Sequence, residues 1–166
     1  MEHAMSTRQK ITPCLWFDGN AEEAVTFYTS LIPDSAIVDV HYALTDTPSG
    51  KEGGVLLIKF TLGGMVYLAL NGGRRDAFND AISLSVDCED QAEVDRYWEA
   101  LTANGGKPVA CGWLKDRYGL SWQIVPRRLP ELLADPDKAK GRRVMQAMME
   151  MVKLDVAELE AAAADD

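Results

Sequence analysis

Length, composition and charge limit the classes of protein to which this chain can belong. Its 166 residues, 47% of them hydrophobic, suffice for a domain with a substantial core, and a net charge of -9 argues against a nucleic-acid partner because phosphates would repel the chain. The three cysteines form no C-x-x-C pair and no apolar segment is long enough to cross a bilayer. We therefore expect a reduced, cytoplasmic protein without membrane contact.

The first part of the chain is predicted to form a strand followed by an amphipathic helix. Residues 11–17 are apolar enough for a buried strand. Asn20 is placed to act as the N-cap of the following helix, and Glu23 completes the capping-box pattern three residues later. Apolar residues then recur at helical spacing up to Ile32, and Pro33 ends the helix.

Three strands are expected next. Residues 35–44 are rich in Ile and Val, which favour strands. A turn-rich loop separates them from two apolar runs, residues 55–62 and 65–71, which are joined by Gly63-Gly64. Two apolar runs connected by a Gly-Gly pair predict a β-hairpin.

The second half is predicted to repeat this order of elements after a boundary at residues 71–76. A strand over 81–86 leads into a helix over 91–104, with Asp90 as its N-cap and Glu93 at the third helical position, a second capping-box pattern. Strands over 108–114 and 120–125 follow, separated by a turn.

Aromatic residues align between the two predicted helices, which strengthens the case for a repeat. Phe27-Tyr28 in the first helix corresponds to Tyr97-Trp98 in the second, and Leu31 corresponds to Leu101. Each half is thus a strand, a helix and further strands. A duplicated module usually means that a site is built between its copies.

The tail after Pro126 changes character and is predicted to be helical. Helices are expected over residues 128–134, 138–153 and 156–163, the last capped by Asp155. The middle helix carries an apolar stripe at helical spacing, made of Met145, Met148, Met149 and Val152. We interpret this tail as a lid or a dimerisation element.

Several segments resemble the glyoxalase/bleomycin-resistance/extradiol-dioxygenase superfamily, also called vicinal oxygen chelate proteins. They are Gly19 with Phe27-Tyr28, the run 82–87, and the run 116–124. Within that superfamily, Asn71-Gly72-Gly73 and residues 112–126 resemble the PhnB-like subgroup, whose members are often labelled 3-demethylubiquinone-9 3-methyltransferase-like.

The resemblance implies an α+β fold in which two βαβββ modules form a cup-shaped curved sheet. The glyoxalase-like domain would cover residues 11–126, with modules at about 11–71 and 79–126, and residues 127–166 would form a C-terminal helical extension. Because relatives build or complete their cups between subunits, it also implies a homodimer.

In metal-dependent members of the superfamily, ligands come from the first and last strands of each module. The resemblance places these positions on Pro13, on Tyr67 or a neighbour, on Ala81 and on Gln123. Proline and alanine side chains offer no lone pair, and a phenol and a neutral amide are weak ligands. We therefore expect no metal and no other cofactor.

Strand alternation divides the remaining side chains between the two faces of each sheet. An apolar set that includes Cys14, Trp16, Leu68 and Leu70 is expected under the helices. The opposite face mixes aromatic, hydroxyl and amide groups, which suits a small neutral ligand or simply fills the cup. The candidate ligand-binding residues are Pro13, Leu15, Phe17, Tyr67, Ala69, Asn71, Ala81, Ser83, Ser85, Trp113, Ser121 and Gln123.

Other reactive or charged side chains have simpler interpretations. Asp116 is expected to organise its own turn, and Cys111 to be an inert thiol because no histidine lies nearby in sequence. Of the two histidines, His3 lies near the start and His41 in a strand, where a structural role is commoner than metal binding. The basic doublets are interpreted as surface or helix-end charge: Arg74-Arg75, Arg127-Arg128 and Arg142-Arg143.

Three functions remain open from the sequence. The first is metal-independent binding of a small molecule, for sequestration or sensing. The second is a metal-free lyase, isomerase or hydrolase in which Tyr67, Gln123 and a serine polarise a carbonyl or hydroxylated substrate. The third is a purely structural dimeric module. Methyl transfer is disfavoured, because the chain has no G-x-G-x-x-G nucleotide-binding pattern.

Overall fold

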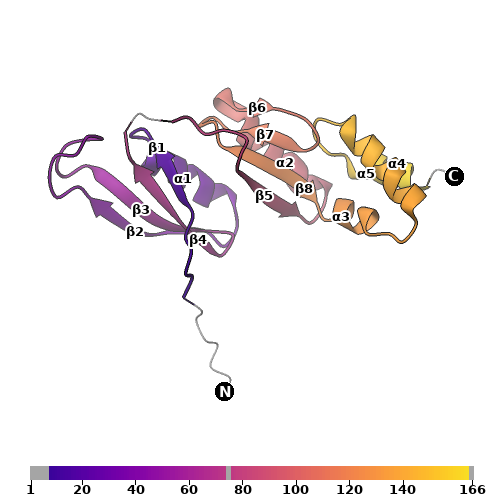
Figure 1. The fold of residues 1–166 in the computed structure, drawn as a ribbon, viewed down its shortest axis with the longest axis horizontal. Helices are drawn as coiled ribbons and strands as arrows, with labels where there is room; N and C mark the ends of the chain where they lie inside the picture. Colours follow the sequence, from indigo (N-terminus) through magenta and orange to yellow (C-terminus); the bar gives the residue numbers. More distant parts are fainter. Residues whose placement is uncertain (1–7, 74–75, 165–166) are drawn as a thin grey trace, which may run out of the picture. The chain divides into compact units, whose positions relative to one another are not determined.

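The computed structural model describes residues 8–73 and 76–164 and divides the chain into two compact units. One unit ends at Asp76 and the other begins at Ala77. Each contains the order strand, helix, strand, strand, strand that the internal repeat predicts (Figure 1). None of the helices in the described ranges is both long and apolar enough to cross a membrane.

The first unit is a four-stranded sheet with one long helix. Its strands lie in the order β1-β4-β3-β2, with β1 parallel to β4 and the other pairs antiparallel. The predicted hairpin is confirmed, because Gly63 and Gly64 have φ angles of 57° and 80°, which a tight turn of this kind requires. The elements are β1 (Cys14–Phe17), α1 (Ala21–Leu31), β2 (Ala36–Tyr42), β3 (Val55–Leu62) and β4 (Met65–Asn71).

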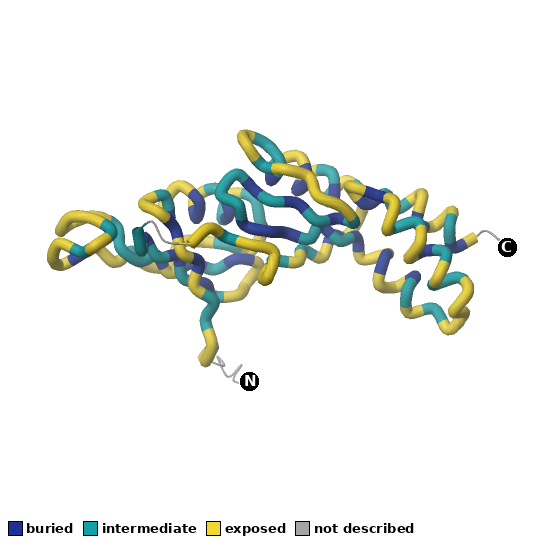
Figure 2. The backbone as a smooth tube through the Cα atoms, turned by 45° about the horizontal axis from the view of Figure 1, so that its top comes forward, coloured by how far each residue is buried: buried dark blue, intermediate teal, exposed yellow. Residues whose placement is uncertain are grey.

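Helix α1 covers one face of this sheet and supplies half of the first core. Ala24, Val25 and Tyr28 on α1 are fully buried, as are Ile58 and Phe60 on β3. Buried positions alternate with exposed or half-buried ones along β1 and β4, as Figure 2 shows. The sheet therefore has one covered face and one open face within this unit.

The second unit repeats the same pairing. Its strands lie in the order β5-β8-β7-β6, with β5 parallel to β8 and the remaining pairs antiparallel. The predicted cap is confirmed, because Asp90 accepts a hydrogen bond from the Glu93 backbone N–H at 2.9 Å. The Glu93 carboxylate accepts from the Glu89 N–H at 2.7 Å, one residue before the Asp90 N–H that a capping box would use. The elements are β5 (Ser83–Cys88), α2 (Gln91–Thr102), a 3-10 turn (Ala103–Gly105), β6 (Lys107–Pro108), β7 (Trp113–Lys115) and β8 (Ser121–Pro126).

The strand predicted over residues 108–114 is wrong, because a tight turn interrupts it. Cys111 and Gly112 have φ angles of 54° and 84°, and the Trp113 N–H donates to the Ala110 carbonyl at 2.9 Å. This turn separates β6 from β7. Two consecutive residues with positive φ reverse the chain here instead of extending it.

Three helices follow the second sheet and pack on one another. They are α3 (Arg128–Leu133), α4 (Lys138–Met149) and α5 (Val156–Ala164), with Asp155 capping α5 as predicted. Their shared core includes the fully buried Val144, Leu154 and Leu159. The predicted methionine stripe is split: Met148 packs against this core, whereas Met145 and Met149 are 48% and 55% exposed.

The segment between α4 and α5 is hydrogen-bonded to the β6–β7 turn and to the start of α2. The N–H groups of Cys111 and Gly112 donate to the carbonyls of Met151 and Val152, both at 2.8 Å. The Gln91 side chain donates to the Leu154 carbonyl at 3.1 Å and accepts from the Val156 N–H at 2.8 Å. Movement of the tail as a lid would have to break these bonds.

Candidate ligand-binding faces

Five of the predicted ligand-binding residues in the first unit lie on the covered face of the sheet, so their assignment to the open face is wrong. They are Leu15, Phe17, Tyr67, Ala69 and Asn71, all 9% exposed or less. Their partners in register, such as Leu15 beside Ala69 and Phe17 beside Asn71, alternate with more exposed residues. They form the core beneath α1.

Asn71 has a specific structural role on that covered face. Its Oδ1 accepts a hydrogen bond from the Ala21 N–H at 3.0 Å, and its Nδ2 donates to the Val55 carbonyl at 2.9 Å. Asn20 is at the predicted cap position, but its side chain makes no capping hydrogen bond within the described part of the chain. A side chain from β4 therefore binds one of the free N–H groups at the start of α1.

Tyr67 is also part of the core. Its ring stacks on Phe60, with 5.6 Å between ring centroids. Burial raises the pKa of the Tyr67 hydroxyl, which keeps the phenol neutral. A neutral, stacked tyrosine beneath a helix is a packing residue.

The open face of the first sheet is mainly apolar. Register places Cys14 beside Leu68, Trp16 beside Leu70, and Leu70 beside Leu57. The Trp16 indole N–H donates to the Gly73 carbonyl at 2.7 Å, and a Cβ on Gly72 would overlap the Trp16 ring. Gly72 thus permits the close approach of this ring to the backbone.

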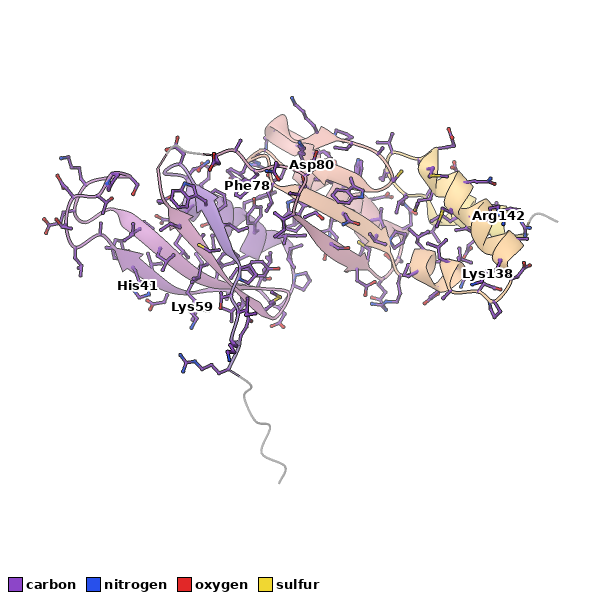
Figure 3. The ribbon with its side chains drawn as sticks, viewed as in Figure 1. His41, Lys59, Phe78, Asp80, Lys138 and Arg142 are labelled. Carbon is purple, nitrogen blue, oxygen red and sulfur yellow. The ribbon has the colours of Figure 1, made fainter. Side chains whose placement is uncertain are left out.

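Charged groups occupy the outer part of that open face. Lys59 lies beside Asp39 in register, and the Asp39 carboxylate is 3.2 Å from the His41 Nε2, an ion pair when the imidazole is protonated. Figure 3 shows His41 and Lys59 on the ribbon of the first unit. His41 is a surface residue. His3 and Arg74-Arg75 lie outside the described residues.

The face assignment in the second unit is confirmed. Ser83 pairs in register with Ser121, and Ser85 with Gln123, whereas Leu84 and Val86 share the opposite face with the buried Trp122 and Ile124. Since Trp113 pairs with Gln123, its side chain belongs to the same face as the serines. The sequence therefore identified the polar face of this sheet.

A direct polar contact joins two of these residues. The Gln123 Nε2 donates to the Ser83 Oγ at 2.9 Å. Among the described residues, the Gln123 Oε1 and the Trp113 indole N–H have no hydrogen-bond partner. The face thus offers an acceptor, a donor and an aromatic ring close together in register.

Asp80 and Lys115 extend this polar face, and the sequence analysis did not identify them. Ser121 is 1% exposed, and its hydroxyl donates to the Asp80 Oδ1 at 3.0 Å. The Lys115 Nζ is 3.1 Å from the same oxygen. These two contacts, Lys115 first, hold the pKa of Asp80 below its ordinary value. Lys115 could have been found from its position two residues after Trp113 on one strand.

Pro13 and Ala81 contribute backbone groups at the edges of the sheets. Each was predicted to lie within a strand, over residues 11–17 and 81–86, but each precedes it, because β1 starts at Cys14 and β5 at Ser83. The Pro13 carbonyl accepts from the Leu68 N–H at 2.8 Å, and the Ala81 N–H donates to Asn79 Oδ1 at 2.8 Å. Their side chains add no polar atom to a site.

Asp116 has the structural role predicted for it, whereas Cys111, expected as a buried inert thiol, is only half-buried. The Asp116 carboxylate is 2% exposed and accepts hydrogen bonds from the N–H groups of Tyr118 and Leu120 and from the Trp122 indole. It organises the turn before β8. The Cys111 thiol lies 3.9 Å from the Met149 carbonyl within the turn that binds the tail.

The donor set does not fit the divalent ion of metal-dependent superfamily members. On the open face of the first sheet, the sequence neighbours of Tyr67 are Val66 and Leu68, whose side chains are hydrocarbons. In the second sheet, Gln123 offers a neutral amide that already binds Ser83. The described residues contain no cluster of three or more His, Cys, Asp or Glu side chains that could hold an ion.

These two βαβββ modules, with helices following the second, define a mixed α+β protein. Residues 9–125 match the family model described as 3-demethylubiquinone-9 3-methyltransferase. The chain belongs to this family, whose PhnB-like members it resembles in sequence and fold. None of the curated proteins matches the chain.

Solved structures agree with this assignment. The PhnB protein from Bacillus cereus is 38% identical, with a TM-score of 0.64, over 71% of this chain and 99% of that chain. Protein PA1353 from Pseudomonas aeruginosa is 20% identical with a TM-score of 0.54, over 72% of this chain and 98% of that one, and shares the fold.

Proposed function

We propose that this protein binds a small molecule without a metal ion, for sequestration or sensing. The observation that carries the proposal is the polar cluster on the open face of β5, β8 and β7. There the Gln123 amide is held by Ser83 at 2.9 Å, and Trp113 is its neighbour in register. The family membership gives the fold, and these side chains supply the recognition chemistry.

The available groups favour a neutral ligand that is partly aromatic and carries a hydroxyl or carbonyl. The Gln123 Oε1 can accept from a ligand hydroxyl, the Trp113 indole N–H can donate to a carbonyl, and the indole ring can stack on an aromatic group. Because Ser83 fixes the amide, little side-chain freedom is lost on binding.

The donor set supports metal-independent binding. Hydrocarbon side chains and a neutral amide stand where relatives carry imidazole or carboxylate groups, so a divalent ion would gain little on leaving water. Elemental analysis of the purified protein should find less than about one-tenth of a divalent ion per chain, and a stoichiometric ion would contradict this part of the proposal.

Neither catalytic alternative gains support from the side chains. The metal-free enzyme needs the Tyr67 hydroxyl beside Gln123, but that phenol is packed on Phe60 beneath α1. Methyl transfer would need a nucleotide-binding βα unit, and the sheets of the described residues combine one parallel pair with antiparallel pairs in each unit. We propose binding as the function.

A ligand screen tests the proposal. Hydroxylated aromatic compounds should raise the melting temperature in the presence of EDTA, and the best of them should bind at least about tenfold more weakly to Gln123→Ala and Ser83→Ala. Gln146→Ala is the matched control, because Gln146 is an exposed amide on α4. Either no stabilising compound at high micromolar concentration, or unchanged affinity in both site variants, would contradict the proposal.

A further inference from the structure

An open groove lies in the helical tail, away from the polar sheet face of the same unit. Its volume is about 440 Å³, which is within the size range of small-molecule sites. It is lined by Leu133, Asp135, Lys138, Gly141, Arg142 and Met145, from the end of α3 and the first half of α4. Gly141 leaves the wall of α4 without a side chain at its centre.

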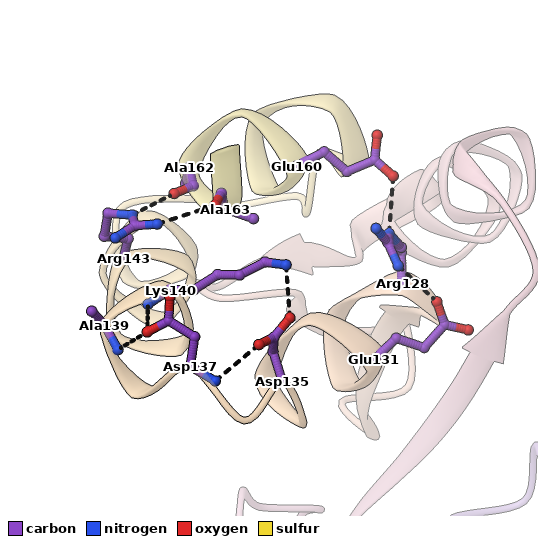
Figure 4. A network of polar contacts seen from close by, with 10 residues as sticks. All are labelled: Arg128, Glu131, Asp135, Asp137, Ala139, Lys140, Arg143, Glu160, Ala162 and Ala163. Atoms are coloured by element: carbon purple, nitrogen blue, oxygen red, sulfur yellow. Dashed lines mark hydrogen bonds and ion pairs between the residues drawn. The ribbon is translucent and has the colours of Figure 1, made fainter. Parts of the chain in front are cut away.

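Several charged side chains near this groove are already paired, as Figure 4 shows. The Lys140 Nζ is 2.7 Å from the Asp135 Oδ2, and both side chains are about 30% exposed. Asp137 accepts hydrogen bonds from the N–H groups of Ala139 and Lys140 at the start of α4. The one carboxylate that lines the groove is thus neutralised by a neighbouring lysine.

Other cations of the tail are satisfied in the same way. Arg128 binds Glu131 and Glu160, Arg143 donates to the carbonyls of Ala162 and Ala163, and Lys153 lies 2.7 Å from the Asp95 Oδ1. The hydrogen-bonding groups of these side chains are therefore engaged within the fold.

Lys138 and Arg142 differ from these neighbours. In the described part of the chain, neither side chain makes an ion pair or a hydrogen bond. They are four residues apart on α4, so they lie on one side of the helix, and Figure 3 shows both there. Two unpaired cations in a chain with a net charge of -9 give this groove a local charge opposite to that of the molecule.

The groove also has apolar walls beside these charges. Leu133 on α3 is half-buried, and Met145, one turn beyond Arg142 on α4, is 48% exposed. An unbranched methionine side chain adapts to ligands of irregular shape. A charged end and an apolar wall in one groove match a molecule with an anionic head and an apolar tail.

We propose that the α3–α4 groove binds a free amphiphilic monocarboxylate, a site separate from the proposed polar site on β8. The carboxylate binds the Arg142 guanidinium, which can donate two parallel hydrogen bonds, and the Lys138 ammonium. The short alkyl chain contacts Met145 and Leu133. The sequence alone suggested only helix-end charge at Arg142, because the groove is formed by two separate helices.

Methyl NMR of the full-length protein tests this site with octanoate as the probe, below its micellar range. The Met145 methyl signal should shift and saturate with octanoate, whereas the Met65 methyl signal should not move, because Met65 lies on β4. Octanol lacks the charge and acetate lacks the tail, so each should bind at least about tenfold more weakly. Titrations at two protein concentrations separate binding from a change in assembly.

Variants of the two cations complete the test. Arg142→Gln and Lys138→Gln should each weaken octanoate binding at least about fivefold, whereas Arg127→Gln, at an exposed arginine that is paired with Asp87, should not. Three results would overturn the proposal: no Met145 shift at millimolar octanoate, an equal response to octanol, or unchanged binding in both variants. None of these results would bear on ligand binding at Gln123, so the two proposals can fail separately.

Discussion

At the scale of single residues, two asparagines show how tertiary structure can replace a local cap. Asn20 has the sequence position of the N-cap of α1. Yet the side-chain acceptor for the Ala21 N–H comes from Asn71, fifty residues after Ala21. The sequence pattern located the start of the helix correctly and assigned the capping group wrongly. A local motif can predict where free N–H groups occur without identifying the side chain that binds them.

Substitution of Asn71 should destabilise the first unit far more than substitution of Asn20. Asn71→Ala leaves the buried Ala21 N–H and the Val55 carbonyl without their partners, so we expect a loss of about 2–4 kcal/mol in the free energy of unfolding. Asn20→Ala should cost less than about 1 kcal/mol. Urea unfolding measures both, and equal losses in the two variants would show that Asn71 is not the dominant cap.

At the scale of elements, the two sheets show when the alternation of side chains along a strand can identify the core face of a sheet. In the second sheet one alternating set is apolar and the other carries Ser83, Ser85 and Gln123, so only one set can be the core face. In the first sheet both sets are apolar, for example Leu15 and Phe17 against Cys14 and Trp16. Alternation then has two equivalent phases, and the packing of α1 decides between them.

Local backbone geometry explains why the hairpin at Gly63-Gly64 could be predicted and the turn at Cys111 could not. Gly63-Gly64 predicts its hairpin because glycine readily adopts positive φ, whereas Cys111 adopts a φ of 54° in a run that otherwise resembles a strand. The turn at Cys111 is stabilised by backbone hydrogen bonds to Met151 and Val152. No residue near position 111 could have revealed partners forty residues away.

Gly112→Ala should be more destabilising than Gly119→Ala, although both glycines have positive φ. The φ angles are 84° and 87°, so both variants incur the left-handed penalty of about 1–2 kcal/mol. A Cβ on Gly112 would also lie 2.9 Å from Leu154 Cδ1, whereas a Cβ on Gly119 meets nothing within 4 Å. We expect about 1–3 kcal/mol of additional loss for Gly112→Ala in urea unfolding.

Equal losses in the two glycine variants would mean that Leu154 yields easily to the added carbon. That result would contradict the close attachment of the tail to the β6–β7 turn. Limited proteolysis gives an independent measurement, because Gly112→Ala should expose the segment after α4 and Gly119→Ala should not. Both measurements thus report on one contact between distant parts of the chain.

At the scale of the whole molecule, the duplication preserves strand pairing while the chemistry of the open faces diverges. β1 and β4 pair in parallel as β5 and β8 do, but the first open face is mainly hydrocarbon and the second carries serine and glutamine. Recognition of a polar ligand is therefore assigned to the second unit. The C-terminal helices add a third surface that has no counterpart in the first unit.

The tail surface also bears on the expected homodimer. Met149 and Val152 are 55% and 49% exposed near the end of α4, and exposed apolar groups of this kind favour association between copies. We expect the wild-type protein to sediment as a dimer at micromolar concentration. Met149→Lys and Val152→Lys should shift it toward monomer, because each would place a lysine in the interface without a partner.

Gln146→Lys is the matched control for these variants, because Gln146 is an exposed polar residue on the same helix. It should leave the sedimentation coefficient unchanged, and circular dichroism should show that all three variants keep their helices. A monomeric wild-type protein would contradict dimerisation itself. A dimer that persists in Met149→Lys and Val152→Lys would place the interface on another surface. The apolar open face of the first sheet is the next candidate, because Trp16 there is 37% exposed and Leu70 beside it is half-buried.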